Sequence, residues 1–277
     1  MKNEIPEIRI VPIEKLMLHE MEELKRTRRL EERIISDGFL KNPIIVGRVK
    51  CDDSKFLLLD GVNRVSAMKN LGFTDITAQI VDYFNRNVGV HAWCHLIHDF
   101  DPQDLLEKIK DIERVDLEKT NRKRARILLE EKKIVCCLFF RNKDVFIIKS
   151  RNDLKTRASK LADVVNVYSE SSMVHRMSET EATFLLRKQK TPTAVVIIPV
   201  YEKKDIVNLA FNGVRLPSGV TRHVIPSRAL NLSVDLALLK CDLSLEDKNK
   251  LIREMVNQKI IYGKTRFYRE SVFVFDE

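Results

Sequence analysis

Asp60, Gly61 and Arg64 lie within five residues and have the chemical types needed to bind a phosphate group. They follow three consecutive leucines and precede apolar residues that recur every three positions, which predicts a buried strand, a glycine turn and a helix. The first N–H groups of a helix have no intrahelical acceptors and favour an anion. The Arg64 guanidinium would add donors that suit phosphate. A strand–turn–helix junction without a ligand would fit the same residues.

A second polar group follows the turn Pro217-Ser218-Gly219. Thr221, Arg222 and His223 place a hydroxyl, a guanidinium and an imidazole on adjacent residues before an apolar segment. Such a group could bind a small zwitterion or anion in a pocket. A polar surface loop is the alternative.

Three histidines, His91, His95 and His98, lie within eight residues and surround Trp93, the only tryptophan. On a helix, His91 and His95 would share one face and could bind a metal ion. No glutamate accompanies them, and a strand would separate them differently. A role in lining a pocket or in the core is therefore favoured over metal binding.

The elements that must position these residues indicate a mixed α/β protein. Two lobes are expected, over residues 1–99 and 100–277, with no repeats and no flexible linker between them. Alternation and apolar runs predict strands near residues 8–10, 42–46, 56–59, 74–81, 194–200 and 267–275 and a hairpin over 133–149. Helical periodicity predicts helices over 28–36, 62–71, 104–129, 154–167, 179–188, 202–212 and 245–258.

Composition describes a soluble globular chain of 277 residues with 44% hydrophobic and 32% charged residues. The formal net charge of +9 suits acidic partners such as nucleotides, nucleic acid or anionic surfaces, but does not choose among them. The five cysteines form no CxxC motif, so reduced thiols are expected rather than disulfides or zinc. No signal peptide or membrane span is recognisable, which favours a cytoplasmic protein.

Motifs in both halves resemble known families. VPIEKLMLHE, NPIIV and LLLDGVNRVSAMKNLGF together resemble the ParB/sulfiredoxin-like superfamily, which holds phosphate at this glycine turn. LHE, the tryptophan and histidine of WxH, and GVTRH occur in the order typical of the free L-serine kinases, particularly those associated with staphyloferrin B siderophore gene clusters. The resemblance implies an α/β (mixed α+β) fold with a ParB/sulfiredoxin-like N-terminal lobe, a larger C-terminal lobe and an active site in the cleft between them.

The resemblance also implies a reaction. A free serine kinase transfers a phosphoryl group from ATP or ADP to the hydroxyl of L-serine with the help of Mg²⁺, and O-phospho-L-serine then serves siderophore, 2,3-diaminopropionate or cysteine-related biosynthesis. Of the two donors, ATP is expected here. The implied roles are a catalytic base for Glu20, a position near the hydroxyl or Mg²⁺ for Asp60, phosphate binding for Gly61, Val62, Asn63 and Arg64, a serine pocket lined by Trp93, Thr221 and His223, and charge neutralisation by Arg222.

One position departs from the family pattern. The family turn has histidine where this chain has Asn63, which can donate a hydrogen bond but cannot shuttle a proton. The alternative function is a ParB-like DNA-binding regulator, which could respond to haem and have little kinase activity. No helix-turn-helix motif follows the first lobe, and no spacing selects a haem ligand. A sulfiredoxin-type reductase is excluded because the turn contains Val62 and Asn63 instead of cysteine. Monomer and dimer both remain open.

Overall fold

Strand β5 (Phe56–Asp60) lies inside a five-stranded sheet and is buried on both faces. Phe56 and Leu58 pack into one hydrophobic cluster, whereas Leu57 and Leu59 pack into another. Alternate side chains of a strand point to opposite faces, so a strand covered on both sides needs an unbroken apolar sequence. This double burial explains the leucine run and fixes the position at which Asp60 emerges.

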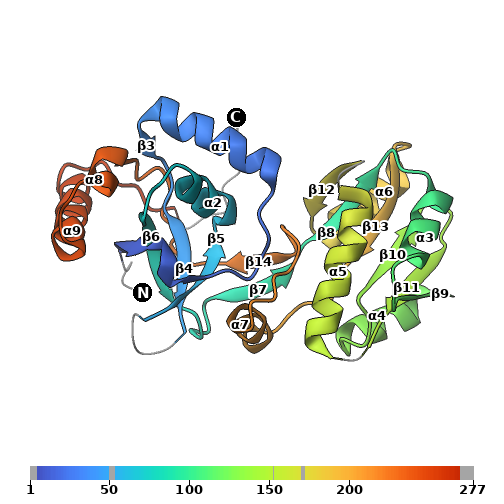
Figure 1. Ribbon diagram of the computed structural model, residues 1–277. Helices are drawn as coiled ribbons and strands as arrows, with labels where there is room; N and C mark the ends of the chain where they lie inside the picture. Colours follow the sequence, from blue (N-terminus) through green and yellow to red (C-terminus); the bar gives the residue numbers. More distant parts are fainter. Residues whose placement is uncertain (1–4, 50–53, 152, 170–171, 269–277) are drawn as a thin grey trace.

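The computed structural model describes residues 5–49, 54–151, 153–169 and 172–268. It shows two lobes side by side (Figure 1). The sheet of the first lobe has the order β1-β6-β4-β5-β2, with antiparallel pairs β1/β6 and β4/β5 and parallel pairs β6/β4 and β5/β2. Its elements are β1 (Glu7–Pro12), a 3-10 turn (Ile13–Lys15), β2 (Leu16–Met17), α1 (Leu24–Asp37), β3 (Phe39–Leu40), β4 (Ile44–Arg48), β5, α2 (Val62–Asn70) and β6 (Asp75–Asp82).

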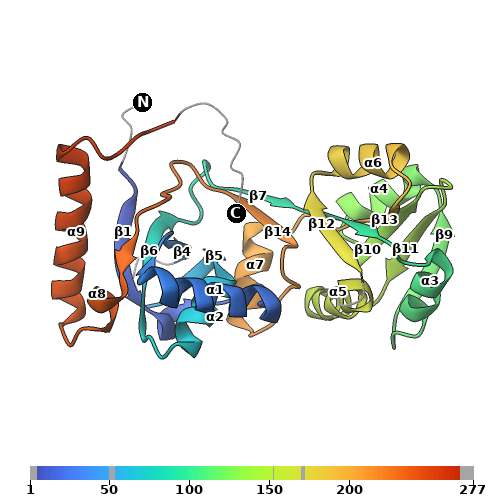
Figure 2. The same cartoon turned by 90° about the horizontal axis from the view of Figure 1, so that it is seen from above.

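The second lobe contains a six-stranded antiparallel sheet of order β12-β8-β13-β10-β11-β9. Helices cover both of its faces (Figures 1 and 2). Its elements are β8 (Cys94–His98), α3 (Pro102–Lys110), β9 (Asp116–Thr120), α4 (Arg122–Glu130), β10 (Cys136–Phe140), β11 (Val145–Lys149), α5 (Leu154–Ser169), β12 (Met173–Met177), α6 (Glu179–Lys188) and β13 (Pro192–Ile197).

After the second sheet the chain returns to the first lobe. Helix α7 (Lys203–Phe211) lies between the lobes, and β14 (Thr221–Val224) pairs with β7 (Gly89–Ala92), the strand that leads from the first lobe into the second (Figure 2). The last elements pack on the first lobe: β15 (Val234–Asp235) pairs with β3, α8 (Leu236–Lys240) contacts β6, and α9 (Leu245–Ile261) contacts β1. The division into two domains between residues 99 and 100 stays a prediction. The structure shows in addition that the chain returns to the first lobe after the second sheet.

Most of the expected elements are present, and the mixed α/β fold is confirmed. The expected helix over 104–129 is wrong, because β9 separates α3 from α4. Charged β9 obtains its backbone partners from β11, a contact that helical periodicity does not detect. Asn121 then starts α4 by accepting a hydrogen bond from the backbone N–H of Arg124 at 3.0 Å. The expected strand over 267–275 lies outside the described residues from position 269 onward.

A cavity of about 520 Å³ lies between the lobes, lined by Met21 and Arg215 on one side and by Thr156, Ser159 and Asp163 of α5 on the other. Of the expected site residues, none lines this cavity.

Cys94, Cys136, Cys137 and Cys241 are free thiols. No helix within the described part of the chain is long and apolar enough to span a membrane.

Candidate active site

Gly61 forms the turn between β5 and α2. Its φ of 105° lies in the left-handed region that favours glycine, and a Cβ atom there would come within 2.8 Å of the Ile44 side chain. Helix α2 begins at the next residue. The N–H groups of its first turn, from Val62 to Arg64, have no acceptor within the helix, and together with the helix dipole they favour an anion. The turn therefore has the backbone form expected from the sequence.

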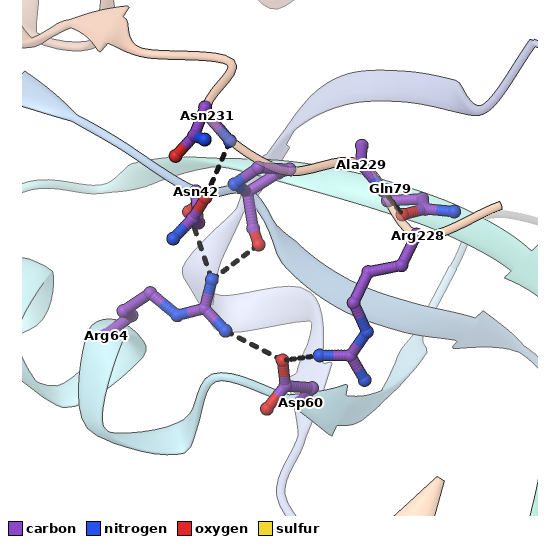
Figure 3. Close-up of polar contacts among 8 residues, drawn as sticks. Asn42, Asp60, Arg64, Gln79, Arg228, Ala229 and Asn231 are labelled. Carbon is purple, nitrogen blue, oxygen red and sulfur yellow. Dashed lines mark hydrogen bonds and ion pairs between the residues drawn. The ribbon is translucent and has the colours of Figure 1, made fainter. Parts of the chain in front are cut away.

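Asp60 is held by two arginines. Its Oδ2 atom accepts hydrogen bonds from Arg64 at 2.9 Å and from Arg228 at 2.8 Å (Figure 3). Burial disfavours the ionised carboxylate, but the two guanidinium groups outweigh burial and hold the pKa of Asp60 below its ordinary value. Asp60 therefore carries its negative charge beside the glycine turn.

Arg64 is committed to protein acceptors. Besides Asp60, it donates through Nη1 to the backbone carbonyl oxygens of Asn42 at 3.1 Å and Pro43 at 2.6 Å. Its side chain is only 17% exposed. These contacts join α2 to the loop before β4. Arg64 therefore stabilises the turn, and its donors are already used by protein acceptors.

Arg228 is the more open of the two arginines, with 37% of its side chain exposed. Buried Gln79 fixes the backbone on both sides of it, donating to the Ser227 carbonyl at 3.1 Å and accepting from the Ala229 N–H at 2.9 Å. Asn42 accepts from the Asn231 N–H at 2.7 Å. Figure 3 shows that the loop over residues 227–231 lies across the sheet and that the guanidinium of Arg228 points to Asp60.

Glu20 lies where the two lobes meet. Its segment pairs with Leu216, whose N–H donates to the His19 carbonyl and whose carbonyl accepts from Met21, both at 2.8 Å. The Glu20 carboxylate accepts three hydrogen bonds: Oε1 from the Thr221 N–H at 2.7 Å and hydroxyl at 2.6 Å, and Oε2 from the Gly219 N–H at 3.1 Å. The carboxylate is partly buried and fixed in orientation, as a general base must be.

A second carboxylate holds the loop that carries these donors. Glu23 pairs with Arg176 of β12 at 2.7 Å and accepts from the Ser218 hydroxyl at 2.8 Å. Gly219 has a φ of 69°, and a Cβ atom there would lie 2.1 Å from Nε of Arg176. The positive φ favours glycine where the loop passes Arg176 and turns toward Glu20, and a larger residue there would displace the Arg176 side chain.

Asn63 connects the glycine turn to the segment that contains Glu20. It is buried, and its Oδ1 accepts hydrogen bonds from the N–H of Glu23 at 2.7 Å and from the Thr27 hydroxyl at 3.3 Å. Glu23 is the N-cap residue of α1, so Asn63 satisfies a donor at the start of that helix. The hydrogen bonds of this amide within the described residues are both made by Oδ1.

The expected serine-binding residues occupy three different environments. Thr221 contacts Glu20, whereas Arg222 lies over the Trp93 ring, 4.5 Å from its centroid. His223 is buried, with Nε2 3.2 Å from the Tyr83 hydroxyl. Because side chains alternate along β14, Arg222 faces away from Thr221 and His223. Burial, together with neighbouring His19, lowers the pKa of His223 to about 3, so this imidazole is neutral near pH 7.

His19 is a site residue to which the sequence assigned no role beyond the LHE motif. It is only 4% exposed. Its Nδ1 lies 2.7 Å from the Leu58 carbonyl oxygen and its Nε2 lies 2.8 Å from the Thr221 hydroxyl. Burial lowers its pKa, and the nearby Glu20 carboxylate opposes this effect. His19 thus joins β5 to the residues that hold Glu20.

The three clustered histidines do not form a metal site. His91 lies on β7 and His95 on β8, where His95 contacts the Tyr168 hydroxyl at 2.8 Å and the Gly219 carbonyl at 3.1 Å. Within the described ranges no group of three histidine, cysteine or acidic residues could hold a metal ion. The expected role of Asp60 toward Mg²⁺ stays a prediction, and its Oδ2 atom is bonded to two arginines in this structure.

Gln79 and Arg228 also belong to this site, although the sequence did not point to them. Gln79 is a polar residue at a buried strand position, which is a detectable signal. Arg228 follows Pro226 and Ser227 near GVTRH, but its contact with Asp60 spans 168 positions of sequence. No local pattern predicts a contact at that separation.

No family model matches the chain. It is 28% identical to the ATP-dependent L-serine kinase of Staphylothermus marinus over 78% of this chain and 85% of that protein. It is 25% identical to the ATP-dependent L-serine kinase SbnI of Staphylococcus aureus, over 98% and 97% of the two chains. The ADP-dependent L-serine kinase SerK of Thermococcus kodakarensis is 23% identical over 82% and 90%.

Solved structures show the same fold. SbnI from Staphylococcus aureus with a C-terminal truncation matches with a TM-score of 0.73 and 23% identity, over 91% of this chain and 97% of that one. A free serine kinase in complex with AMP matches with a TM-score of 0.71 and 23% identity, over 86% and 98%. The resemblance to the free L-serine kinases that the sequence motifs indicate is thereby confirmed over most of the chain.

Proposed function

We propose that this protein is an ATP-dependent free L-serine kinase that produces O-phospho-L-serine. The named relatives support the reaction class, and the site described above supplies groups for it. Phosphoryl transfer requires mainly that the reactants be positioned and that developing charge be neutralised. The site combines a fixed carboxylate with a helix N-terminus and arginine side chains.

The observation that carries the proposal is the coordination of Glu20. Its carboxylate is held by three donors from Gly219 and Thr221, where the two lobes meet. Such a carboxylate can accept the serine hydroxyl proton as that oxygen attacks phosphorus. Through Glu23 and Asn63 the same segment contacts the first turn of α2, where the phosphates would lie.

The remaining residues receive roles from their contacts. The N–H groups from Gly61 to Arg64 and the Nδ2 of Asn63 would bind the phosphoryl group. Arg228 would meet phosphate oxygens because its guanidinium is the more exposed, while Arg64 holds Asp60 in place. The serine would lie beside Glu20 and Thr221. Trp93 and Arg222 pack against each other on the opposite side of β14, so the roles expected for them at the serine are the part of the assignment that the geometry supports least.

Mg²⁺ would arrive with the nucleotide and neutralise phosphate charge, with Asp60 as its protein ligand. ATP is the proposed donor because two ATP-dependent relatives cover most of this chain. The cytoplasmic location and the role in siderophore, 2,3-diaminopropionate or cysteine-related biosynthesis stay predictions. The DNA-binding regulator is not favoured, because the named relatives are kinases, and no observation supports DNA or haem as a ligand.

The direct test is to incubate the purified protein with L-serine, Mg²⁺ and either ATP or ADP, and to detect O-phospho-L-serine by mass spectrometry. We expect product with ATP. Glu20→Gln preserves the size of the side chain and removes the base, so it should lower the rate by at least about 10²-fold while the circular dichroism spectrum stays unchanged. Product formation by this variant at the wild-type rate would refute the assignment of Glu20.

A further inference from the structure

We propose that His19 and Thr221 form a proton relay behind Glu20, so that the proton removed from the substrate hydroxyl is shared along Glu20, Thr221 and His19. This inference rests on the proposed function, because it takes Glu20 to be the base. It assigns a catalytic contribution to a buried histidine that would not touch the substrate.

The contacts of His19 fix which of its ring nitrogens carries a hydrogen. Its Nδ1 lies 2.7 Å from the carbonyl oxygen of Leu58. A carbonyl oxygen only accepts, so Nδ1 must carry a hydrogen. In a neutral imidazole the other nitrogen, Nε2, is then an acceptor. This nitrogen lies 2.8 Å from the Thr221 hydroxyl.

Glu20, Thr221 and His19 have one proton too few to make two hydrogen bonds. The Thr221 hydroxyl lies 2.6 Å from Oε1 of Glu20 as well as 2.8 Å from His19, but it has one hydrogen to donate. With Glu20 ionised and His19 neutral, two close contacts must share that single hydrogen. One additional proton on the three side chains would make both contacts hydrogen bonds. The three hydrogen-bonded side chains can therefore accept one proton between them.

That proton can occupy either end. When Glu20 holds it, Glu20 donates to Thr221 and Thr221 donates to His19. When His19 holds it, the imidazolium donates to Thr221 and Thr221 donates to ionised Glu20. The two arrangements differ only in the positions of the hydrogens along these two short hydrogen bonds.

The surroundings of His19 favour its neutral form, so the additional proton is absent at the start of the reaction. His19 is buried between β5, which supplies the Leu58 carbonyl, and β14, which supplies Thr221 and His223. The His223 ring meets it edge-on at 5.2 Å between centroids. His223 is neutral near pH 7 and contacts the Tyr83 hydroxyl. Glu20 is the charged group that acts on His19, and burial lowers the pKa of His19 despite it.

Phosphoryl transfer and proton movement occur together. The serine oxygen forms a bond to the phosphorus as the bond between that phosphorus and the leaving nucleotide oxygen breaks. The serine hydroxyl proton moves to Glu20, the Glu20 proton moves to Thr221, and the Thr221 proton moves to Nε2 of His19. After product leaves, the protons return along the same path, and partly exposed Glu20 releases one to solvent. No oxidant or reductant is involved.

A pair of variants at Thr221 tests the relay. Thr221→Val keeps the shape and the backbone N–H that bonds Glu20 but removes the hydroxyl, whereas Thr221→Ser keeps the hydroxyl. We expect Thr221→Val to lower the single-turnover rate by about 10- to 100-fold and Thr221→Ser to retain most of it. Rates measured in mixtures of H₂O and D₂O should give a curved proton inventory for wild type and Thr221→Ser, and a straight line for Thr221→Val. A straight line for wild type would overturn the relay.

A second measurement does not depend on turnover. The ¹⁵N signals of the His19 imidazole, identified by their loss in His19→Gln, can be titrated by NMR in both Thr221 variants. We expect a lower pKa for His19 in Thr221→Val than in Thr221→Ser, because the imidazolium loses its acceptor and its link to Glu20. Equal values would overturn the shared proton. If wild type makes no O-phosphoserine, the proposed function fails, and this titration still decides whether the three groups share a proton.

Discussion

The side-chain oxygen of Asn63 accepts a hydrogen bond from the backbone N–H of Glu23 at 2.7 Å. Asn63 therefore has a structural task at the first turn of α2, the position at which the sequence departs from the expected family pattern. It caps the start of α1, and it presents its amide nitrogen at the turn that would bind phosphate.

Two substitutions separate these tasks. Asn63→Ala removes the acceptor and should lower the free energy of unfolding by about 1–2 kcal/mol, measured by urea denaturation. Asn63→Asp keeps an acceptor for Glu23 but places a negative charge at the anion site. It should stay near wild-type stability while ATP affinity, measured by calorimetry, falls at least tenfold. Wild-type ATP affinity in Asn63→Asp would show that phosphate binds elsewhere.

The two arginines that share Asp60 should respond differently to removal. Arg228→Ala should weaken ATP binding by about tenfold or more, consistent with losing one charge-assisted hydrogen bond, and should weaken AMP binding less. Arg228→Lys should restore part of the affinity. Arg64→Ala deletes contacts with three protein acceptors and should mainly lower stability, by about 2 kcal/mol or more. The opposite pattern, with affinity lost in Arg64→Ala alone, would exchange the two roles.

Gly219 offers a prediction with a matched control. Gly219→Ala must strain a φ of 69° and displace Arg176, which would move the Gly219 N–H away from Glu20. Gly213 has the same φ, but a Cβ atom there would meet no atom within 4 Å. Both variants should lose about 1–2 kcal/mol from the left-handed backbone. Only Gly219→Ala should also lose kcat, by tenfold or more, and equal kcat values would refute the positioning role.

His223 makes stability depend on pH. Its pKa is lowered from 6.5 to about 3, so between these values the unfolded chain binds a proton that the folded chain does not. The free energy of unfolding should therefore fall as pH falls from 6.5 toward 3, with a slope of at most about 1.4 kcal/mol per pH unit from this residue. His95, with a pKa lowered to about 4 by burial, adds to the same slope. His223→Gln should reduce the slope measured between pH 7 and pH 5, and an unchanged slope would contradict the assignment.

The sequence predicted those parts of the fold that depend on local patterns. The leucine run, Gly61 and the apolar spacing after it predicted β5, the turn and α2, and the hairpin of β10 and β11 followed from two apolar segments around Arg141–Asp144. Helix α6 has the predicted bounds because Ser178 and Glu181 form a capping box at its start.

The sequence was less informative about partners. Arg64 has the right type for a phosphate ligand, but carbonyl groups of the loop before β4 take its donors. Thr221, Arg222 and His223 are adjacent in sequence, yet strand pairing with β7 sends Arg222 to the opposite side from its neighbours. These outcomes depend on contacts between distant segments, which composition and periodicity do not encode.

The hydrogen-bond donors of Glu20 also affect the order in which the protein folds during synthesis. Its three donors lie 199 and 201 positions away along the chain. A ribosome that has completed the first sheet has therefore not yet synthesised the loop that holds the carboxylate, and contacts of such long range slow folding because chain entropy is lost before they form. The carboxylate of Glu20 therefore obtains these three donors only after the chain has been synthesised as far as Thr221. The kinase site is thus one of the last features of this molecule to assemble, and its formation reports that synthesis has passed Thr221.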